Sequence, residues 1–154
     1  MGPNPTDRAK GGAKRSLLTD GAGIPLGIVV DGANRNDFQL LGPTIESIPI
    51  PRPRPTKERP QGLCLDKGYD YAQARDTVKH FRYTPHIRSR GEEQREQRRS
   101  RRHKARRWVV ERTHSWLNRH RSILVRWAKK AENYVGLLHF ACALVAFRAS
   151  GLFG

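Results

Sequence analysis

GLCLDKGYDYAQARDTVKHFRYTPHI, residues 62–87, decides the fold class of this chain. A short apolar run at 62–65 and a second one at 83–87 are each typical of a β-strand. Between them the sequence predicts a helix over 71–81, with four residues roughly on one face: Tyr71, Ala74, Val78 and Phe81. Strand, turn, helix and strand in this order indicate a βαβ unit, whose crossover makes the two strands parallel.

Upstream of this unit the sequence predicts a β-hairpin. Apolar runs at 16–19 and 24–30 flank the turn-forming cluster 20–23, and the second run is apolar nearly throughout, as in a strand covered on both faces. A short helix is expected over 37–47 with Asp37 as its N-cap, although Gly42-Pro43 weakens its middle. Residues 1–13 have the glycine and proline content of a loop.

Downstream the segments differ in composition. Residues 49–60 hold five prolines and are expected to form an exposed, extended connection, whereas the basic segment 88–107 has no apolar period. A helix is expected over 108–119, with both Trp108 and Trp116 in the core. The last helix, over 133–150, is apolar on most sides, so it should be the most buried helix. Together these elements predict a mixed α/β sheet flanked by helices.

The chain has a formal net charge of +16, from 30 basic and 14 acidic residues. An excess of this size repels itself unless a polyanion offsets it, so nucleic acid is the expected partner. No segment holds the roughly twenty uninterrupted apolar residues that cross a bilayer, and MGPNPTDRAK lacks the apolar core of a signal peptide. We therefore expect a cytoplasmic, nucleoid-associated protein without a membrane partner.

The two cysteines, Cys64 and Cys142, lie far apart in apolar runs, which predicts buried free thiols. The six histidines are scattered, and none is spaced with a cysteine as zinc ligands are. We therefore exclude a zinc site.

Two carboxylates stand out by position. Asp66 follows the strand at 62–65, and ligand sites gather at the carboxyl ends of strands in α/β sheets. Glu111 is the one acidic residue among thirteen Lys or Arg residues at 98–130. Carboxylates from separate elements can share divalent cations such as Mg²⁺, which suits chemistry at a phosphodiester.

Each of these residues also has a structural interpretation. Asp66 precedes a glycine turn and is expected as a turn or cap residue on pattern alone. Glu111 could balance the charge of Arg107 or Lys104, one to two turns before it. The basic run could be a solvated tail, and a non-catalytic nucleic-acid-binding module stays open as the alternative function.

Several blocks of the chain, in one order, resemble a known family: Gly2–Arg8 with Gly12–Arg15, Leu18–Gly21 with Ile24–Leu26, Gly32–Asp37, Leu65–Asp70, and Arg107–Arg112 continuing to Trp116-Leu117. These blocks are similar to those of bacterial insertion-sequence transposases of the DDE class, specifically the insertion-sequence 5 group. The resemblance covers nearly all of the chain and implies an RNase H-like catalytic core over 14–154.

The resemblance assigns roles to individual residues. It implies that Asp66 is the second catalytic aspartate and Glu111 the catalytic glutamate, both as metal ligands. Residues expected to contact or position DNA are Arg107, Arg112, Arg119 and Arg121, and for Arg107 the alternative role is to orient Glu111. The implied cofactor is Mg²⁺ (or Mn²⁺), as two ions in the complete active site, and the implied partner is double-stranded DNA, both transposon ends and target.

The chain departs from the family pattern in two ways. Related families have a tyrosine and a lysine where this sequence has Lys104 and Asn118. In the family the first catalytic aspartate lies on a strand upstream of the block that opens this sequence. We therefore expect an RNase H-like sheet without its first strand, with an exposed edge at Leu65. Such a chain would bind DNA without cleaving it, and its partner would be an upstream-frame product or a second copy.

Overall fold

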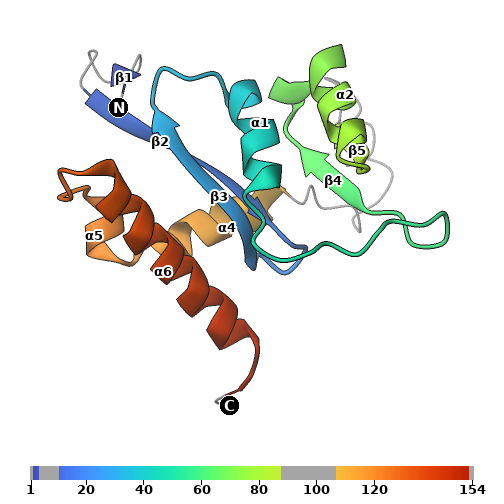
Figure 1. The fold of residues 1–154 in the computed structure, drawn as a ribbon. Coiled ribbons are helices and arrows are strands. Elements are labelled where there is room, and N and C mark those ends of the chain that lie inside the picture. Colours follow the sequence, from blue (N-terminus) through green and yellow to red (C-terminus); the bar gives the residue numbers. More distant parts are fainter. Residues whose placement is uncertain (1, 4–10, 88–106, 153–154) are drawn as a thin grey trace, which may run out of the picture.

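The computed structural model describes residues 2–3, 11–87 and 107–152, with only the backbone of residue 107 (Figure 1). The elements in chain order are β1 (Gly2–Pro3), β2 (Gly11–Thr19), β3 (Pro25–Gly32), α1 (Asp37–Glu46), β4 (Gly62–Leu65), the 3-10 helix η1 (Lys67–Tyr69), α2 (Ala72–His80), β5 (Thr84–Ile87), α4 (Arg107–Asn118), α5 (Arg121–Leu124) and α6 (Ala131–Ala149). Nearly all of the predicted basic segment, at 88–106, lies outside the described residues.

The predicted β-hairpin is confirmed as β2 and β3, paired in antiparallel register with Leu17 opposite Ile28. Its turn is closed by Asp20, whose Oδ1 accepts from the backbone N of Ala22 at 2.9 Å and of Ile24 at 2.8 Å. The prediction of a loop over 1–13 was wrong at both ends, since β1 pairs with the first residues of β2. Backbone pairing extends this hairpin into glycine-rich sequence that has no strand periodicity of its own.

The βαβ unit is also confirmed. β4 and β5 pair in parallel, with Leu63 opposite Pro85, and α2 crosses between them. The chain is therefore mixed α/β, with one antiparallel and one parallel sheet. The expected single sheet is not observed in the described residues, because no described strand pairs with both β2 and β4.

The hairpin separates two apolar clusters, because successive side chains of a strand point to opposite faces. Leu17 packs against the first cluster, which joins β3 to α4, α5 and α6: Ile28, Leu117, Ile123, Tyr134, Leu138 and Ala141. Leu18 packs against the second, which joins α1 to the βαβ unit: Leu41, Ile45, Leu63, Ala74 and Val78. On β3, Ile28 packs in the first cluster and the neighbouring Gly27 packs against α1, so the expectation that the second hairpin strand is covered on both faces is confirmed.

Helix α1 begins differently from the prediction. Asn36, not Asp37, is its N-cap, and Asn36 Oδ1 accepts from the backbone N of Phe38 at 3.2 Å. Asp37 is instead the first helical residue, where its charge favours the helix N-terminus, and it forms a 3.1 Å ion pair with Lys14. The helix continues through Pro43. It packs closely on β3, since a Cβ added at Gly27 would lie 2.6 Å from the Thr44 carbonyl oxygen.

Three burial predictions were wrong. Helix α6 is not deeply buried: it packs one stripe on β3, and its Phe140 is 64% exposed, because the hairpin offers it one face only. Cys64 is exposed, because it alternates with the inward-facing Leu63 in a two-stranded sheet. Cys142 is half-buried, and burial raises the pKa of its thiol to about 11.

The proline-rich connection at 49–60 does more than link two elements, since the Arg52 guanidinium donates a hydrogen bond to the Phe81 carbonyl oxygen.

Within the described parts of the chain, no helix is long and apolar enough to cross a membrane.

Candidate catalytic carboxylates and basic surface

Asp66 lies at the carboxyl end of β4, as predicted. Its Oδ1 accepts from the backbone N of Lys67 at 2.7 Å, and its carbonyl oxygen accepts from the backbone N of Tyr69 at 2.9 Å. These bonds make Asp66 the N-cap of η1, so the cap interpretation of this residue is confirmed. A cap role leaves the side chain at the surface, where it is exposed.

Tyr69 lies in the 3-10 helix that Asp66 caps, and two carboxylates affect its hydroxyl. Burial raises the pKa of the Tyr69 hydroxyl to about 12, and the negative charges of Asp37, Tyr71 and Asp66 add to this rise. Asp37 comes from the start of α1, so that helix brings a second carboxylate toward the end of β4. Its proximity could not be read from the sequence, because α1 and β4 are 16 or more residues apart and are joined only by packing.

Glu111 lies on α4, and the opposite face of this helix packs against the rest of the fold. Val109, Thr113 and Leu117 are buried, and the Thr113 hydroxyl donates to the Gly23 carbonyl oxygen at 2.7 Å. Gly23 has a φ of +87°, a conformation that favours glycine, so the hairpin turn fits closely against this helix. The Glu111 side chain is exposed. Its suggested pairing with Lys104 or the Arg107 side chain falls outside the described residues.

The two carboxylates, Asp66 and Glu111, have the ligand chemistry that a hard cation prefers. Carboxylate oxygens suit Mg²⁺. Asp66 follows β4, which packs in the cluster around α1 and the βαβ unit, whereas α4 packs in the other cluster. In the ranges that the structure describes, no group of three or more His, Cys, Asp or Glu side chains could hold a metal ion.

Arg112 has structural contacts. Its Nη2 donates to the Ala22 carbonyl oxygen at 2.6 Å, and its guanidinium lies 4.4 Å from the ring centroid of Trp108 and 4.7 Å from that of Trp116. The prediction that Trp108 belongs to the core was wrong, because stacking on this cation holds the ring 46% exposed at the surface. Trp116 is half-buried.

The other predicted DNA-contact residues lie toward the end of α4 and beyond it. Arg119 and Arg121 are both exposed. The Arg121 guanidinium lies 5.5 Å from the ring centroid of Trp127, which is 68% exposed. The sequence interpretation missed Trp127, although its place between Arg126 and Lys129-Lys130 was the available signal. The side chain of Arg107 lies outside the described residues.

Asn118, which departs from the family signature, accepts a hydrogen bond from an arginine of another element. Asn118 Oδ1 accepts from Nη2 of Arg15, on β2, at 2.8 Å. A positive charge from another element is therefore held at the position where related families have a lysine. Sequence reasoning missed Arg15, since the contact joins residues 103 positions apart.

His114, beside this pair, should make stability depend on pH. Burial, followed by the positive charge of Arg15, lowers the pKa of His114 below its ordinary value of 6.5. A lowered histidine pKa means that the unfolded state binds more protons below that value, so stability is complete above it and falls as pH falls. We expect the free energy of unfolding to drop between pH 7.5 and 5 with a slope of at most about 1.4 kcal/mol per pH unit from this residue. Urea titrations would measure it. A His114→Gln variant with an unchanged slope would contradict this assignment.

Comparison with known proteins decides the family. The family model described as transposase DDE domain matches residues 2–146. The chain belongs to the DDE transposase family. This family carries out DNA transposition, binds DNA and uses divalent metal ions, so the function expected from the sequence is confirmed at that level.

A transposase of known sequence supports the assignment. The transposase described for insertion sequence element IS402 of Burkholderia cepacia is 37% identical over 153 residues, which cover 95% of this chain and 68% of that protein. No solved structure matches the chain significantly. Membership of the insertion-sequence 5 group stays a prediction.

Proposed function

We propose that this chain binds transposon DNA and contributes Asp66 and Glu111 to a site for metal-dependent strand nicking and strand transfer. The observation that carries the proposal is the position of Asp66 at the carboxyl end of a parallel strand. Ligands of open α/β sheets bind at this end of the strands.

The proposed roles follow from residue chemistry. Asp66 and Glu111 are metal ligands, with Mg²⁺ as the ion and Mn²⁺ as its substitute. Two such ions, bound in a complete site, would activate the attacking oxygen and stabilise the leaving oxygen of a phosphodiester. Arg119 and Arg121 are exposed and can bind phosphate directly. Arg107 is proposed for the same role, whereas Arg112 would reach phosphate only by giving up its bond to Ala22.

We also propose that the two sheets are parts of one RNase H-like sheet. In such a sheet one strand lies between the hairpin and the strand that ends in the second aspartate. Among the described residues, β4 pairs with β5 on one side only, and β2 pairs along Ala13–Thr19 with β3 only. Both open edges could therefore accept the same strand.

A nucleoid location follows if DNA is the partner.

The metal role can be tested without relying on cleavage. We expect the double variant Asp66→Asn, Glu111→Gln to bind Mn²⁺ at least about tenfold more weakly, since oxygen ligands are lost. Titration followed by electron paramagnetic resonance measures this affinity. Asp76→Asn is the matched control, because Asp76 is exposed on α2 and should not contribute. An unchanged Mn²⁺ affinity in the double variant would refute the metal role.

The alternative is a non-catalytic nucleic-acid-binding module. It is supported by the basic segment 98–130, in which Arg119 and Arg121 are exposed. We predict that the chain binds duplex DNA without nicking it. Mg²⁺-dependent nicking by the purified chain that Glu111→Gln abolishes would overturn this prediction and support a complete site.

A further inference from the structure

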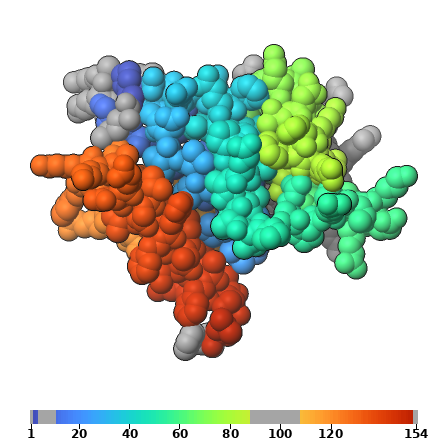
Figure 2. Space-filling view, viewed as in Figure 1, coloured from blue at the N-terminus to red at the C-terminus, as the bar shows by residue number. Residues whose placement is uncertain are grey.

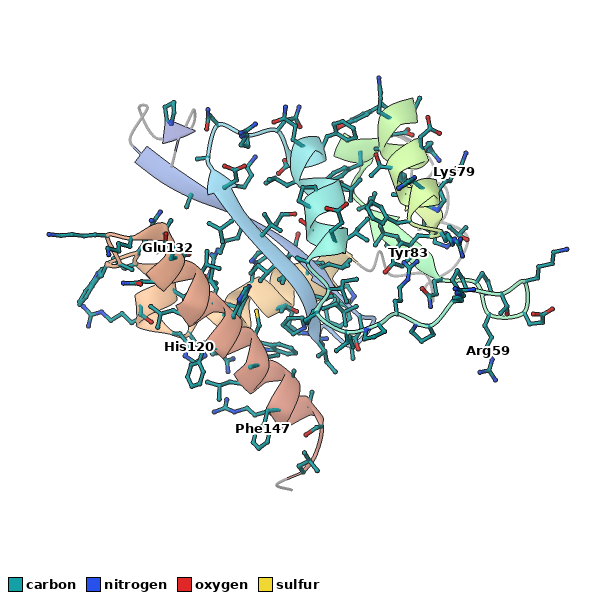
Figure 3. The ribbon with its side chains drawn as sticks, in the orientation of Figure 1. Arg59, Lys79, Tyr83, His120, Glu132 and Phe147 are labelled. Atoms are coloured by element: carbon teal, nitrogen blue, oxygen red, sulfur yellow. The ribbon has the colours of Figure 1, made fainter. Side chains whose placement is uncertain are left out.

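Part of the connection between α1 and β4 forms an arm that projects from the body of the molecule. This arm consists of residues 53–60 (PRPTKERP). Figure 2 shows it in green at the right edge of the surface, and Figure 3 labels Arg59 on it, pointing away from the rest of the chain. Arg54, Lys57 and Arg59 are all exposed. The arm thus presents three cations to solvent.

The base of the arm is closed by contacts with the fold and across the arm itself. Just before the arm, the Arg52 guanidinium lies 3.8 Å from the ring centroid of Tyr83 and donates to the Phe81 carbonyl oxygen. Just after it, Nε2 of Gln61 donates to the Pro53 carbonyl oxygen at 2.9 Å. These contacts fix the place at which the arm leaves the fold.

The tip of the arm is also ordered. The backbone N of Thr56 donates to the Arg59 carbonyl oxygen at 3.3 Å, and the backbone N of Arg59 donates to the Thr56 hydroxyl at 3.1 Å. Prolines at positions 53, 55 and 60 restrict φ along the rest of the arm. An arm held in this way loses little conformational entropy when it binds a ligand.

The cations of the arm are not neutralised by ion pairs. Glu58 is the one acidic residue of the arm, and hydrogen bonds from its own backbone and from the Thr56 side chain lower its pKa. Among the residues that the structure describes, Arg54, Lys57 and Arg59 form no ion pair. The positive charge of the arm is therefore available to an anionic partner.

We propose that this arm binds the phosphate backbone of duplex DNA through Arg54, Lys57 and Arg59. The inference rests on the proposed function, because DNA is the polyanion that the DDE transposase family binds. A lipid surface fits the arm less well, since segments that enter lipid headgroups combine cations with large apolar residues, and the arm has no apolar residue besides proline. Phosphate contacts position a protein without reading sequence, so the arm would act on any duplex.

The arm lies apart from the regions that the proposed function assigns to metal and to DNA. It enters β4 at the first residue of the strand, whereas Asp66 follows the last one. Four strand residues at about 3.3 Å each separate the two ends by roughly 13 Å. In Figure 1 the arm and α5, which carries Arg121, lie on opposite sides of the molecule. The arm is therefore a second point of attachment, away from the proposed site of strand cleavage.

Fluorescence anisotropy of the purified chain with a labelled duplex, at several salt concentrations, tests the arm. The triple variant Arg54→Gln, Lys57→Gln, Arg59→Gln should lower the steepness of log affinity against log salt by about 2.7, at about 0.9 per phosphate contact. The decrease should be the same for two duplexes of unrelated sequence. Arg148→Gln is the matched control, because Arg148 is an exposed cation at the end of α6 and should leave the slope unchanged.

The outcomes separate the arm from the proposed function. A slope that falls for Arg119→Gln with Arg121→Gln, but not for the triple variant, would refute the arm and leave DNA binding standing. A chain without affinity for DNA would refute both. Binding to phosphatidylserine vesicles that the triple variant abolishes, with unchanged affinity for DNA, would assign the arm to a lipid surface and overturn the proposal.

Closure of the base has a test of its own. Gln61→Ala removes the hydrogen bond to the Pro53 carbonyl oxygen but no charge. DNA affinity should therefore fall about two- to tenfold at one salt concentration, while the slope against salt stays the same. Gln73→Ala, at an exposed position of α2, is the control and should keep full affinity. Equal affinities of the two variants would contradict a role for the fixed base in binding.

Discussion

Raising the NaCl concentration from about 50 to about 200 mM is expected to weaken binding of this chain to duplex DNA by about 10³–10⁵-fold, as for proteins that neutralise six to ten phosphates. The reason is the release of counterions when Lys and Arg replace them along the DNA. The segment 98–130 concentrates thirteen such residues, and Arg119 and Arg121 in it are exposed. Fluorescence anisotropy at several salt concentrations gives the slope of log affinity against log salt.

The same measurement locates the interface. Arg119→Gln with Arg121→Gln should lower the steepness of the slope by about two, since each phosphate contact contributes about 0.9. The control is Lys79→Gln, which removes one exposed charge from α2, on the other side of the molecule from α5 (Figure 1). Should the control change the slope as much per charge as the arginine variants, the binding surface would not be the one proposed.

Leu117→Ala is expected to lower the free energy of unfolding by about 3–5 kcal/mol. Leu117 is 0% exposed and lies in the cluster that joins α4 to the hairpin and to α6. The substitution removes apolar contacts and leaves a cavity, because the surrounding elements cannot collapse freely around it. Domains of this size have about 5–15 kcal/mol of stability in total, so the variant should lose a large part of it.

Urea unfolding followed by circular dichroism measures this loss. Leu124→Ala provides the matched control, since the same atoms are removed from a side chain that is 60% exposed. Its effect should stay within about 0.5 kcal/mol. Similar losses in both variants would mean that α4 does not anchor the fold as described.

Prediction from sequence succeeded where the signal is local. The hairpin, the βαβ unit and α4 follow from short apolar runs and turn residues, and their observed bounds differ from the expected ones by a few residues. It failed for burial. Phe140 and Trp108 are apolar, yet exposed, because burial depends on which partner surface an element meets.

For the candidate site, too, the sequence predicted some of the residues and missed others. Asp66 and Glu111 were found because each occupies an unusual place in its own segment. Asp37 and Arg15 were missed, because packing of α1 against the βαβ unit brings Asp37 near Tyr69, and packing of α4 against the hairpin brings Asn118 near Arg15. Whether Asp66 and Glu111 hold one metal stays a prediction for the Mn²⁺ titration.

The sequence by itself determined the family, the order of the hairpin, the βαβ unit and the longer helices, and the basic charge that indicates nucleic acid as the partner. These depend on residue types and on spacing within short segments. Only the tertiary structure decided that the strands form two sheets in the described residues, that Arg112 is held between two tryptophans, and that α6 keeps an apolar face outward. The physical reason is that each of these features depends on contacts between segments distant in sequence.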